Sequence, residues 1–84
     1  MKDRLIEEYG DCVKDGLMFA NRLDDAIIGI EERTFRIVYS KKKVIDILTN
    51  ELDGDRDAAC EFANYNIFDA YVGELTPIWV EDNL

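Results

Sequence analysis

Two cysteines and one cluster of carboxylates are the residues of this chain that could most readily carry out chemistry. Cys12 and Cys60 lie far apart in the sequence, outside any CxxC pair, and the chain has no histidine. This pattern excludes the usual zinc ligand sets and thioredoxin-like redox chemistry. A nucleophilic cysteine needs a base or a cation beside it, whereas acids adjoin both thiols here. We therefore expect two buried free thiols rather than a disulfide or a catalytic cysteine.

The alternating aspartates Asp53, Asp55 and Asp57 partly match a calcium-binding loop. Such a loop requires a glycine at its sixth position and a carboxylate at its twelfth. Ala58 and Asn64 stand at these two positions, so capping of a helix explains the aspartates better. The chain also lacks a glycine-rich phosphate loop. The sequence predicts no metal, no cofactor and no enzymatic activity.

Net charge is the strongest overall bias in the composition. Nineteen acids and ten bases give a net charge of −9. Such a field repels nucleic acids and anionic membrane surfaces, so we expect direct binding to neither. Residues 33–43 nevertheless hold five of the bases and no acid. This basic segment either balances the surrounding carboxylates or forms a site for an anion or an acidic partner.

Length and composition indicate a single small domain over residues 1–84. The hydrophobic content of 48% and the aromatic content of 11% are normal for a folded chain. The N-terminus is charged and lacks the apolar core of a secretory leader, and no apolar run is long enough to span a bilayer. We expect a cytoplasmic protein. A homodimer is one way for so small a core to gain burial.

Hydrophobic periodicity predicts an α+β fold. A short amphipathic helix is expected at residues 1–9. Apolar alternation and β-branched residues predict strands at residues 26–30 and 35–39, joined as an antiparallel hairpin, and a third strand at residues 78–80. Gly29 marks either a bulge or a close backbone approach. We expect a small antiparallel three-stranded sheet, of open strand order, packed against two main helices.

Both main helices are expected between the second and third strands. Ser40 is the predicted N-cap of a helix over residues 41–52, and Asp55 that of a helix over residues 56–72. Pro77 bars any continuation of the second helix. Apolar residues recur along that helix at three-and-four spacing, in a stripe made by Ala59, Phe62, Ala63, Asn66, Ile67, Ala70 and Tyr71.

Two features leave alternatives open. Asn66 lies on the apolar stripe, where an amide needs hydrogen-bond partners. Its side chain is expected either to bond the backbone near residues 73–77 or the hairpin, or to recognise a partner. The apolar run at residues 17–20 is expected to form either a buried turn or a single helical turn.

Four large rings stand near the C-terminal end of the chain: Tyr65, Phe68, Tyr71 and Trp79. They exceed what one short helix face can bury, so we expect one or two of them to be exposed. Tyrosine and tryptophan dominate the hot spots of protein interfaces. The candidate partner-binding residues are therefore these four rings together with the acids Asp53, Asp55, Asp57 and Glu61.

Residues 24–30, 37–39 and 62–79 carry a family resemblance. The most distinctive part is Tyr65-Asn66-Ile67, Asp69-Ala70-Tyr71-Val72-Gly73-Glu74 and Thr76-Pro77-Ile78. These residues resemble a family of small acidic proteins that is widespread in bacteriophage genomes and generally has no assigned function. The resemblance extends over about two thirds of the chain. It implies expression inside an infected bacterium and supplies no catalytic or binding residues.

A binding module is the function that the sequence best supports. We expect it to bind a host protein, such as a component of a defence system or of nucleic-acid processing, and to inhibit or modulate it. In one variant the acids mimic the phosphates of a nucleic acid. The alternative is a self-associating structural or assembly accessory protein. Acids gathered on one convex face would favour mimicry, a symmetric apolar patch would favour self-assembly, and scattered acids beside a rim of aromatics would favour inhibitor-like binding.

Overall fold

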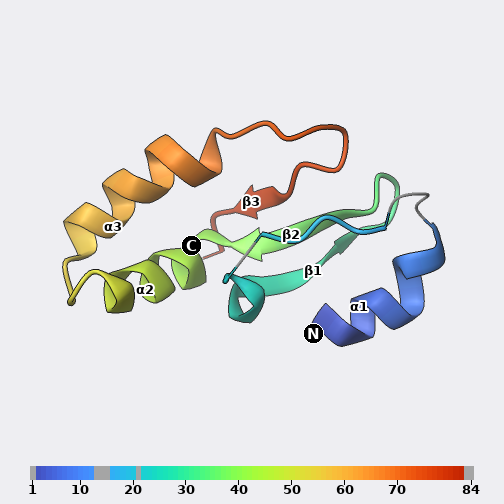
Figure 1. The fold of residues 1–84 in the computed structure, drawn as a ribbon, viewed down its shortest axis with the longest axis horizontal. Coiled ribbons are helices and arrows are strands. Elements are labelled where there is room, and N and C mark those ends of the chain that lie inside the picture. Colours follow the sequence, from blue (N-terminus) through green and yellow to red (C-terminus); the bar gives the residue numbers. More distant parts are fainter. Residues whose placement is uncertain (1, 13–15, 21, 83–84) are drawn as a thin grey trace.

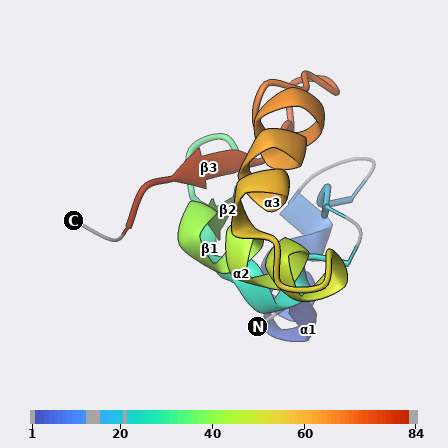
Figure 2. The ribbon, with the colours of Figure 1, turned by 90° about the vertical axis from the view of Figure 1, so that its left-hand side faces the viewer.

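The computed structural model describes residues 2–12, 16–20 and 22–82. Its helices and strands are, in chain order, α1 (Lys2–Tyr9), β1 (Ile27–Glu31), β2 (Arg36–Ser40), α2 (Lys41–Glu51), α3 (Arg56–Ala63) and β3 (Ile78–Val80). Single turns lie at η1 (Gly10–Cys12), η2 (Asp24–Ala26) and η3 (Asn64–Phe68), of which η3 is a π-helical turn. The molecule is elongated, 39 × 24 × 23 Å. Figure 1 shows α2 and α3 at one end and α1 at the other, and Figure 2 shows α2 beside α3.

The α+β class is confirmed, but the sheet is mixed rather than antiparallel throughout. Its strand order is β1-β2-β3. β1 runs antiparallel to β2, which confirms the hairpin, and the register shifts between Ile27 and Gly29 as a bulge. β3 runs parallel to β2, with Trp79 opposite Tyr39, so the predicted direction of this strand is wrong.

The route of the chain from β2 to β3 explains the parallel pairing. The chain leaves β2 through α2, and α3 folds back beside α2 (Figure 1). The loop at residues 69–77 then carries the chain along the sheet to the beginning of β2. There the Arg36 Nε donates a hydrogen bond to the Thr76 carbonyl oxygen over 2.6 Å. Because the chain passes the start of β2 at Thr76 and enters β3 opposite Val38, β3 runs in the same direction as β2.

A polar turn closes the hairpin between β1 and β2. The Glu31 carboxylate accepts hydrogen bonds from the backbone N–H groups of Arg33 and Thr34, each 2.9 Å long, and from the Thr34 hydroxyl at 2.7 Å. The bond from Arg33, followed by those from Thr34, lowers the pKa of Glu31 because it favours the charged form. Phe35 has a positive φ of 59°. It therefore belongs to the turn and not to the predicted strand at residues 35–39.

Both predicted helix caps are confirmed. The Ser40 hydroxyl oxygen accepts a hydrogen bond from the Lys43 N–H at 3.1 Å, and the Asp55 carboxylate accepts one from the Ala58 N–H at 3.0 Å. Each bond satisfies a donor that the first turn of a helix leaves unpaired. Ser40 also donates its hydroxyl to the Asp82 Oδ1 at 2.7 Å, which ties the end of β2 to the residues after β3.

The second helix ends earlier than predicted. α3 stops at Ala63, and the chain widens into η3 instead of continuing as an α-helix to residue 72. A π turn takes more residues per turn than an α-helix, so the following side chains leave the apolar stripe. Ala59 and Ala63 of α3 are completely buried, whereas Tyr71, which follows η3 on the predicted stripe, is 78% exposed.

Asn66 is exposed on this widened turn. Its Nδ2 donates a hydrogen bond to the Phe62 carbonyl oxygen at 3.1 Å. The predicted bond to the backbone near residues 73–77 or to the hairpin is therefore wrong, because the π turn rotates the amide out of the core.

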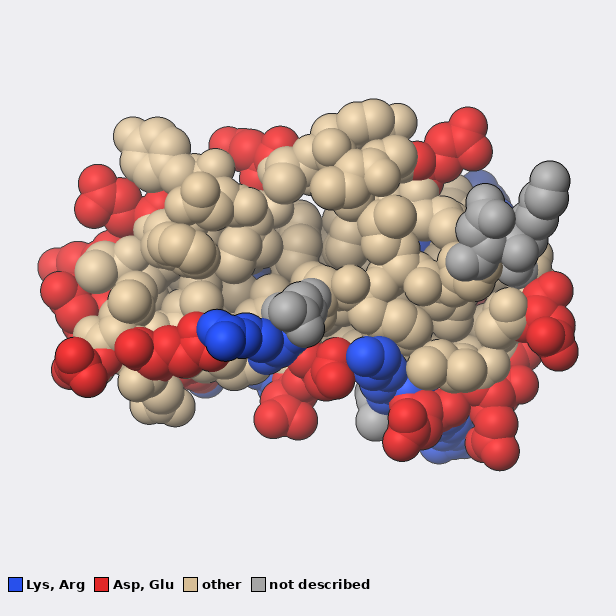
Figure 3. Space-filling model, viewed as in Figure 1, with Lys and Arg blue, Asp and Glu red and all other residues tan. Residues whose placement is uncertain are grey.

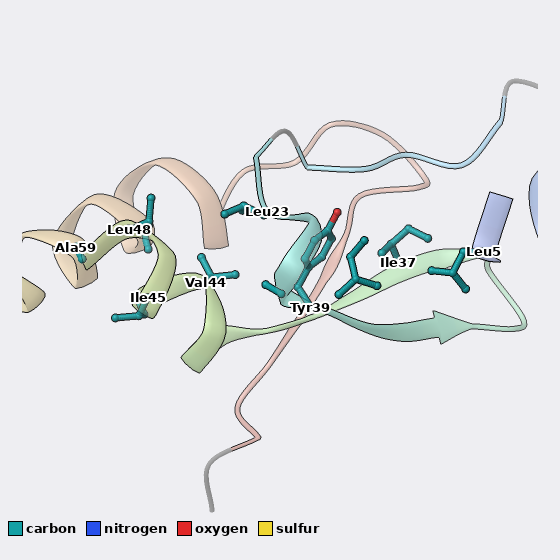
Figure 4. Close-up of a cluster of buried hydrophobic side chains, with 11 residues drawn as sticks. Leu5, Leu23, Ile37, Tyr39, Val44, Ile45, Leu48 and Ala59 are labelled. Carbon is teal, nitrogen blue, oxygen red and sulfur yellow. The ribbon is translucent and has the colours of Figure 1, made fainter. Parts of the chain in front are cut away.

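Eleven buried apolar side chains join the sheet to the helices (Figure 4). They are Leu5, Leu23, Ala26, Ile27, Ile37, Tyr39, Val44, Ile45, Leu48, Ala59 and Ala63. The central strand contributes Ile37 and Tyr39, which have no exposed surface. The core therefore runs from β2 into α2 and α3, the two helices that follow β2 in the sequence.

Tyr39 connects three separate parts of the chain. Its ring stacks on Trp79 of β3, with centroids 4.9 Å apart. Its hydroxyl oxygen accepts a hydrogen bond from the Ala20 N–H at 2.7 Å. Residues 16–20 form neither the buried turn nor the helical turn predicted for this region. The segment has no helical residue, and the hydrogen bond to Tyr39 holds it against the sheet. Burial of the ring raises the pKa of Tyr39.

We predict that Tyr39→Phe lowers the free energy of unfolding by about 1–3 kcal/mol, because the Ala20 N–H loses its acceptor while the ring still stacks on Trp79. Urea denaturation followed by circular dichroism measures this loss. Tyr65→Phe is the control, since it removes a hydroxyl from a side chain that is 81% exposed. An equal loss of stability in both variants would contradict the assigned role of the Tyr39 hydroxyl.

We predict that Glu31 titrates below its ordinary pKa of 4.5 when its carboxylate is followed by NMR. Because the pKa is lowered in the folded state, the stabilisation from Glu31 is present above the unfolded-state pKa. It is lost as the pH falls through the folded-state pKa. Thr34→Val removes the hydroxyl donor and keeps both backbone donors, so the pKa of Glu31 should rise toward its ordinary value. A pKa that does not change in this variant would show that the hydroxyl bond is absent in solution.

Candidate functional site

An apolar groove crosses one face of the molecule, visible as a hollow between two masses of uncharged residues in Figure 3. It consists of two adjoining hollows with volumes of about 360 and 210 Å³, which share Leu23 and Ile67. The larger is lined by Met18, Phe19, Ala20, Leu23, Asn66, Ile67, Ala70, Val72, Pro77 and Trp79. The smaller adds Arg22, Leu48, Glu51 and Phe62. These residues are called the apolar groove below.

Segments far apart in the sequence form its walls. Residues 18–20 with Leu23 make one wall, which the hydrogen bond from Ala20 to Tyr39 fixes to β2. η3 and the loop at residues 69–77 make the other. Trp79 lies against both Tyr39 and Phe68, with ring centroids 4.9 and 5.5 Å away. Its indole Nε1 is buried and has no hydrogen-bond partner among the residues that the structure describes.

Thr76 holds the loop wall in shape. Its hydroxyl oxygen accepts a hydrogen bond from the Val72 N–H at 2.9 Å, and the hydroxyl donates to the Gly73 carbonyl oxygen at 2.6 Å. Gly73 has a φ of +120°, which glycine adopts without the steric cost of a Cβ. The Thr76 carbonyl is in turn bonded to Arg36 of β2. The loop is thereby anchored, and it presents Val72 to solvent with 55% of its surface exposed.

Acids are spread around the uncharged centre of this face (Figure 3). Exposed acids adjoin the lining segments in the sequence at Asp24, Asp25, Asp69 and Glu74. Lys2 offsets one of them, since its Nζ lies 3.7 Å from the Asp24 carboxylate and 5.1 Å from the centre of the Phe19 ring. The groove therefore combines an apolar interior with a largely acidic surround.

The structure separates the four predicted aromatic anchors. Trp79 lines the apolar groove, and Tyr71, 78% exposed, stands between the lining residues Ala70 and Val72. Phe68 is half-buried against Trp79. Tyr65 is 81% exposed and lines neither hollow.

The four predicted acids lie away from the groove. Asp53 and Asp55 belong to the turn between α2 and α3, and Asp57 and Glu61 lie on α3. All four are exposed, and none lines either hollow. Asp55 serves as the helix cap, and Asp53 has a positive φ of 58° within the turn.

Sequence reasoning missed the wall formed by residues 18–20. The signal was present as the apolar run Leu17-Met18-Phe19-Ala20. The run shows neither the periodicity of a helix nor the alternation of a strand, so its structure could not be predicted from the sequence. The structure gives the reason, since this extended segment takes its position from a hydrogen bond to the distant Tyr39.

The groove offers shape and apolar surface. Within residues 2–12, 16–20 and 22–82, no group of three or more side chains is arranged to hold a metal ion. No helix of this part of the chain combines the length and the apolar character needed to cross a membrane.

Cys12 and Cys60 are free thiols, as predicted, but Cys12 is exposed and Cys60 only half-buried, so the predicted burial is wrong for Cys12.

Comparison of the chain with family models, with curated proteins and with solved structures gave no significant match. The resemblance to small acidic phage proteins therefore stays a prediction.

Proposed function

We propose that the protein is a non-enzymatic binding module whose apolar groove takes an apolar segment of another protein, flanked by basic residues. The observation that carries this proposal is the groove itself, with Val72 and Tyr71 exposed beside it. Ligand-binding sites are typically concave and mostly apolar, with volumes of roughly 300–1,000 Å³, and the larger hollow of about 360 Å³ falls in this range. In the infected bacterium that the resemblance implies, the partner is a host protein, and binding inhibits or modulates it.

Charge decides which partner segment fits. Acids outnumber bases around the uncharged centre of the face in Figure 3, although Arg22 lines the smaller hollow, and the chain as a whole carries a charge of −9. Complementary charges at the edge of an interface steer encounter and suppress wrong partners. A segment with lysine or arginine beside its apolar residues is therefore attracted, and an acidic segment is repelled.

Inhibitor-like binding is better supported than nucleic-acid mimicry. A mimic presents its acids in a row along one face, whereas on the face shown in Figure 3 they are scattered around an uncharged centre. Of the four acids predicted to bind a partner, Asp53 and Asp55 lie in the turn between α2 and α3, and Asp57 and Glu61 lie on α3. Asp55 is already engaged in capping.

We predict that Val72→Glu weakens partner binding at least about tenfold, because it places a carboxylate against apolar side chains. The probes are peptides selected from a random display library on the unaltered protein, which should be apolar with basic flanks. Their affinity is measured by calorimetry. Tyr65→Glu is the matched control, since it adds the same charge at an exposed ring outside the groove, and its affinity should stay within about twofold.

Circular dichroism establishes that both variants fold. Affinity capture from a bacterial lysate then identifies the partner, as a protein retained by Tyr65→Glu and lost by Val72→Glu. Selection of acidic peptides, or equal losses in the two variants, would contradict the proposal. A dimer in light scattering that Val72→Glu dissociates, with no captured protein, would instead establish self-association.

A further inference from the structure

A second pocket lies between α2, η3 and the start of α3, and it shares no lining residue with the apolar groove. Its volume is about 270 Å³, and its lining includes Lys41, Lys42, Arg56, Cys60, Phe68 and Glu81. Three cations and one acid thus meet in one pocket of a protein whose net charge is −9. We call it the basic pocket.

Ion pairs hold two of these cations at the pocket without neutralising it. Asp46 lies 3.7 Å from the Lys42 Nζ and 3.0 Å from an Arg56 guanidinium nitrogen, and so joins α2 to α3. Even when Asp46 is counted with Glu81, the three cations outnumber the acids. The Lys41 Nζ lies 5.0 Å from the centre of the Phe68 ring.

The position of the lysines on α2 favours the binding of an anion. The N-terminus of a helix carries partial positive charge, so cations in its first turn are unfavourable. α2 begins with Lys41, Lys42 and Lys43 and has no acid in its first turn. An anion in the basic pocket would relieve both the repulsion among the cations and their repulsion by the helix dipole.

We propose that the basic pocket binds a small organic anion, with its carboxylate or phosphate among Lys41, Lys42 and Arg56 and its apolar body against Phe68. The volume is slightly below the roughly 300–1,000 Å³ of pockets for drug-sized ligands, which suits a ligand with a single ring. This site is independent of the partner segment proposed for the apolar groove.

Benzoate is the probe, followed by amide chemical shifts in NMR titrations. It should shift the amides at residues 41–45 and 56–64, and benzyl alcohol, with the same ring and no charge, should not. Lys41→Gln should weaken benzoate binding at least about fivefold through the lost attraction. Lys43→Gln is the matched control, since it removes the same charge from the same helical turn outside the pocket, and it should leave the affinity within about twofold.

The thiols provide a second readout. Cys60 lines the pocket, and the exposed Cys12 adjoins Asp11. In single-cysteine variants, an anionic aromatic disulfide should favour Cys60 over Cys12 about tenfold more than a neutral disulfide does. In each reaction the thiolate attacks one sulfur, forms a mixed disulfide and releases the other half as a thiolate. Benzoate should slow the reaction at Cys60 alone.

Several results would overturn the proposal. Equal binding of benzoate and benzyl alcohol would show that charge has no role. An equal loss of benzoate affinity in Lys41→Gln and Lys43→Gln would show that benzoate responds to the overall electrostatic field and not to the basic pocket. Inorganic phosphate binding as tightly as benzoate would remove the role of Phe68. Tighter binding of a blocked glutamyl peptide would assign the pocket to a side chain of a protein partner. Thermal melting of both lysine variants separates loss of binding from loss of folding.

Discussion

The side chain of Tyr39 holds together the parts of the molecule that form the apolar groove. It lies on the central strand, where the register places it opposite Ile27 on one side and Trp79 on the other. A hydroxyl in an apolar core needs a hydrogen-bond partner, and this one finds it in the Ala20 N–H. The same ring therefore fixes the base of the groove through Trp79 and one wall through Ala20.

Local signals in the sequence predicted most of the elements, because the residues that create each signal lie close to one another. Ser40 and Asp55 cap helices whose first turns begin at the next residue. The position of β3 follows from a short pattern in the same way, and of the two alternatives that Gly29 indicated the structure has the bulge. The direction of β3 could not be predicted, since an apolar run of three residues fits a strand in either direction. The direction of β3 depends on the path of residues 69–77. That path is fixed by the hydrogen bond between Arg36 and Thr76, which are forty residues apart in the sequence.

The candidate site was only partly predictable for the same physical reason. The surplus of rings was visible in the sequence, but their burial depends on distant contacts. Phe68 is partly buried against Lys41, and Trp79 is partly buried against Tyr39. Tyr65 and Tyr71, in contrast, are mostly exposed to solvent. The π turn at η3 also lies beyond pattern reasoning, because the apolar spacing before and after it is compatible with one continuous helix. Two consecutive residues of this turn, Ile67 and Phe68, line different surfaces.

Those consecutive residues place the apolar groove and the basic pocket on two sides of η3. Ile67 lines the groove, and Phe68 lines the pocket. The Phe68 ring contacts Trp79 at 5.5 Å between centroids and Lys41 at 5.0 Å from its Nζ, so one ring supports both sites. Replacing Phe68 would disturb both together, and a lost activity could not be assigned to either. Lys41 and Val72 each line only one of the two sites, so the binding of an anion and the binding of a protein segment are separable through them.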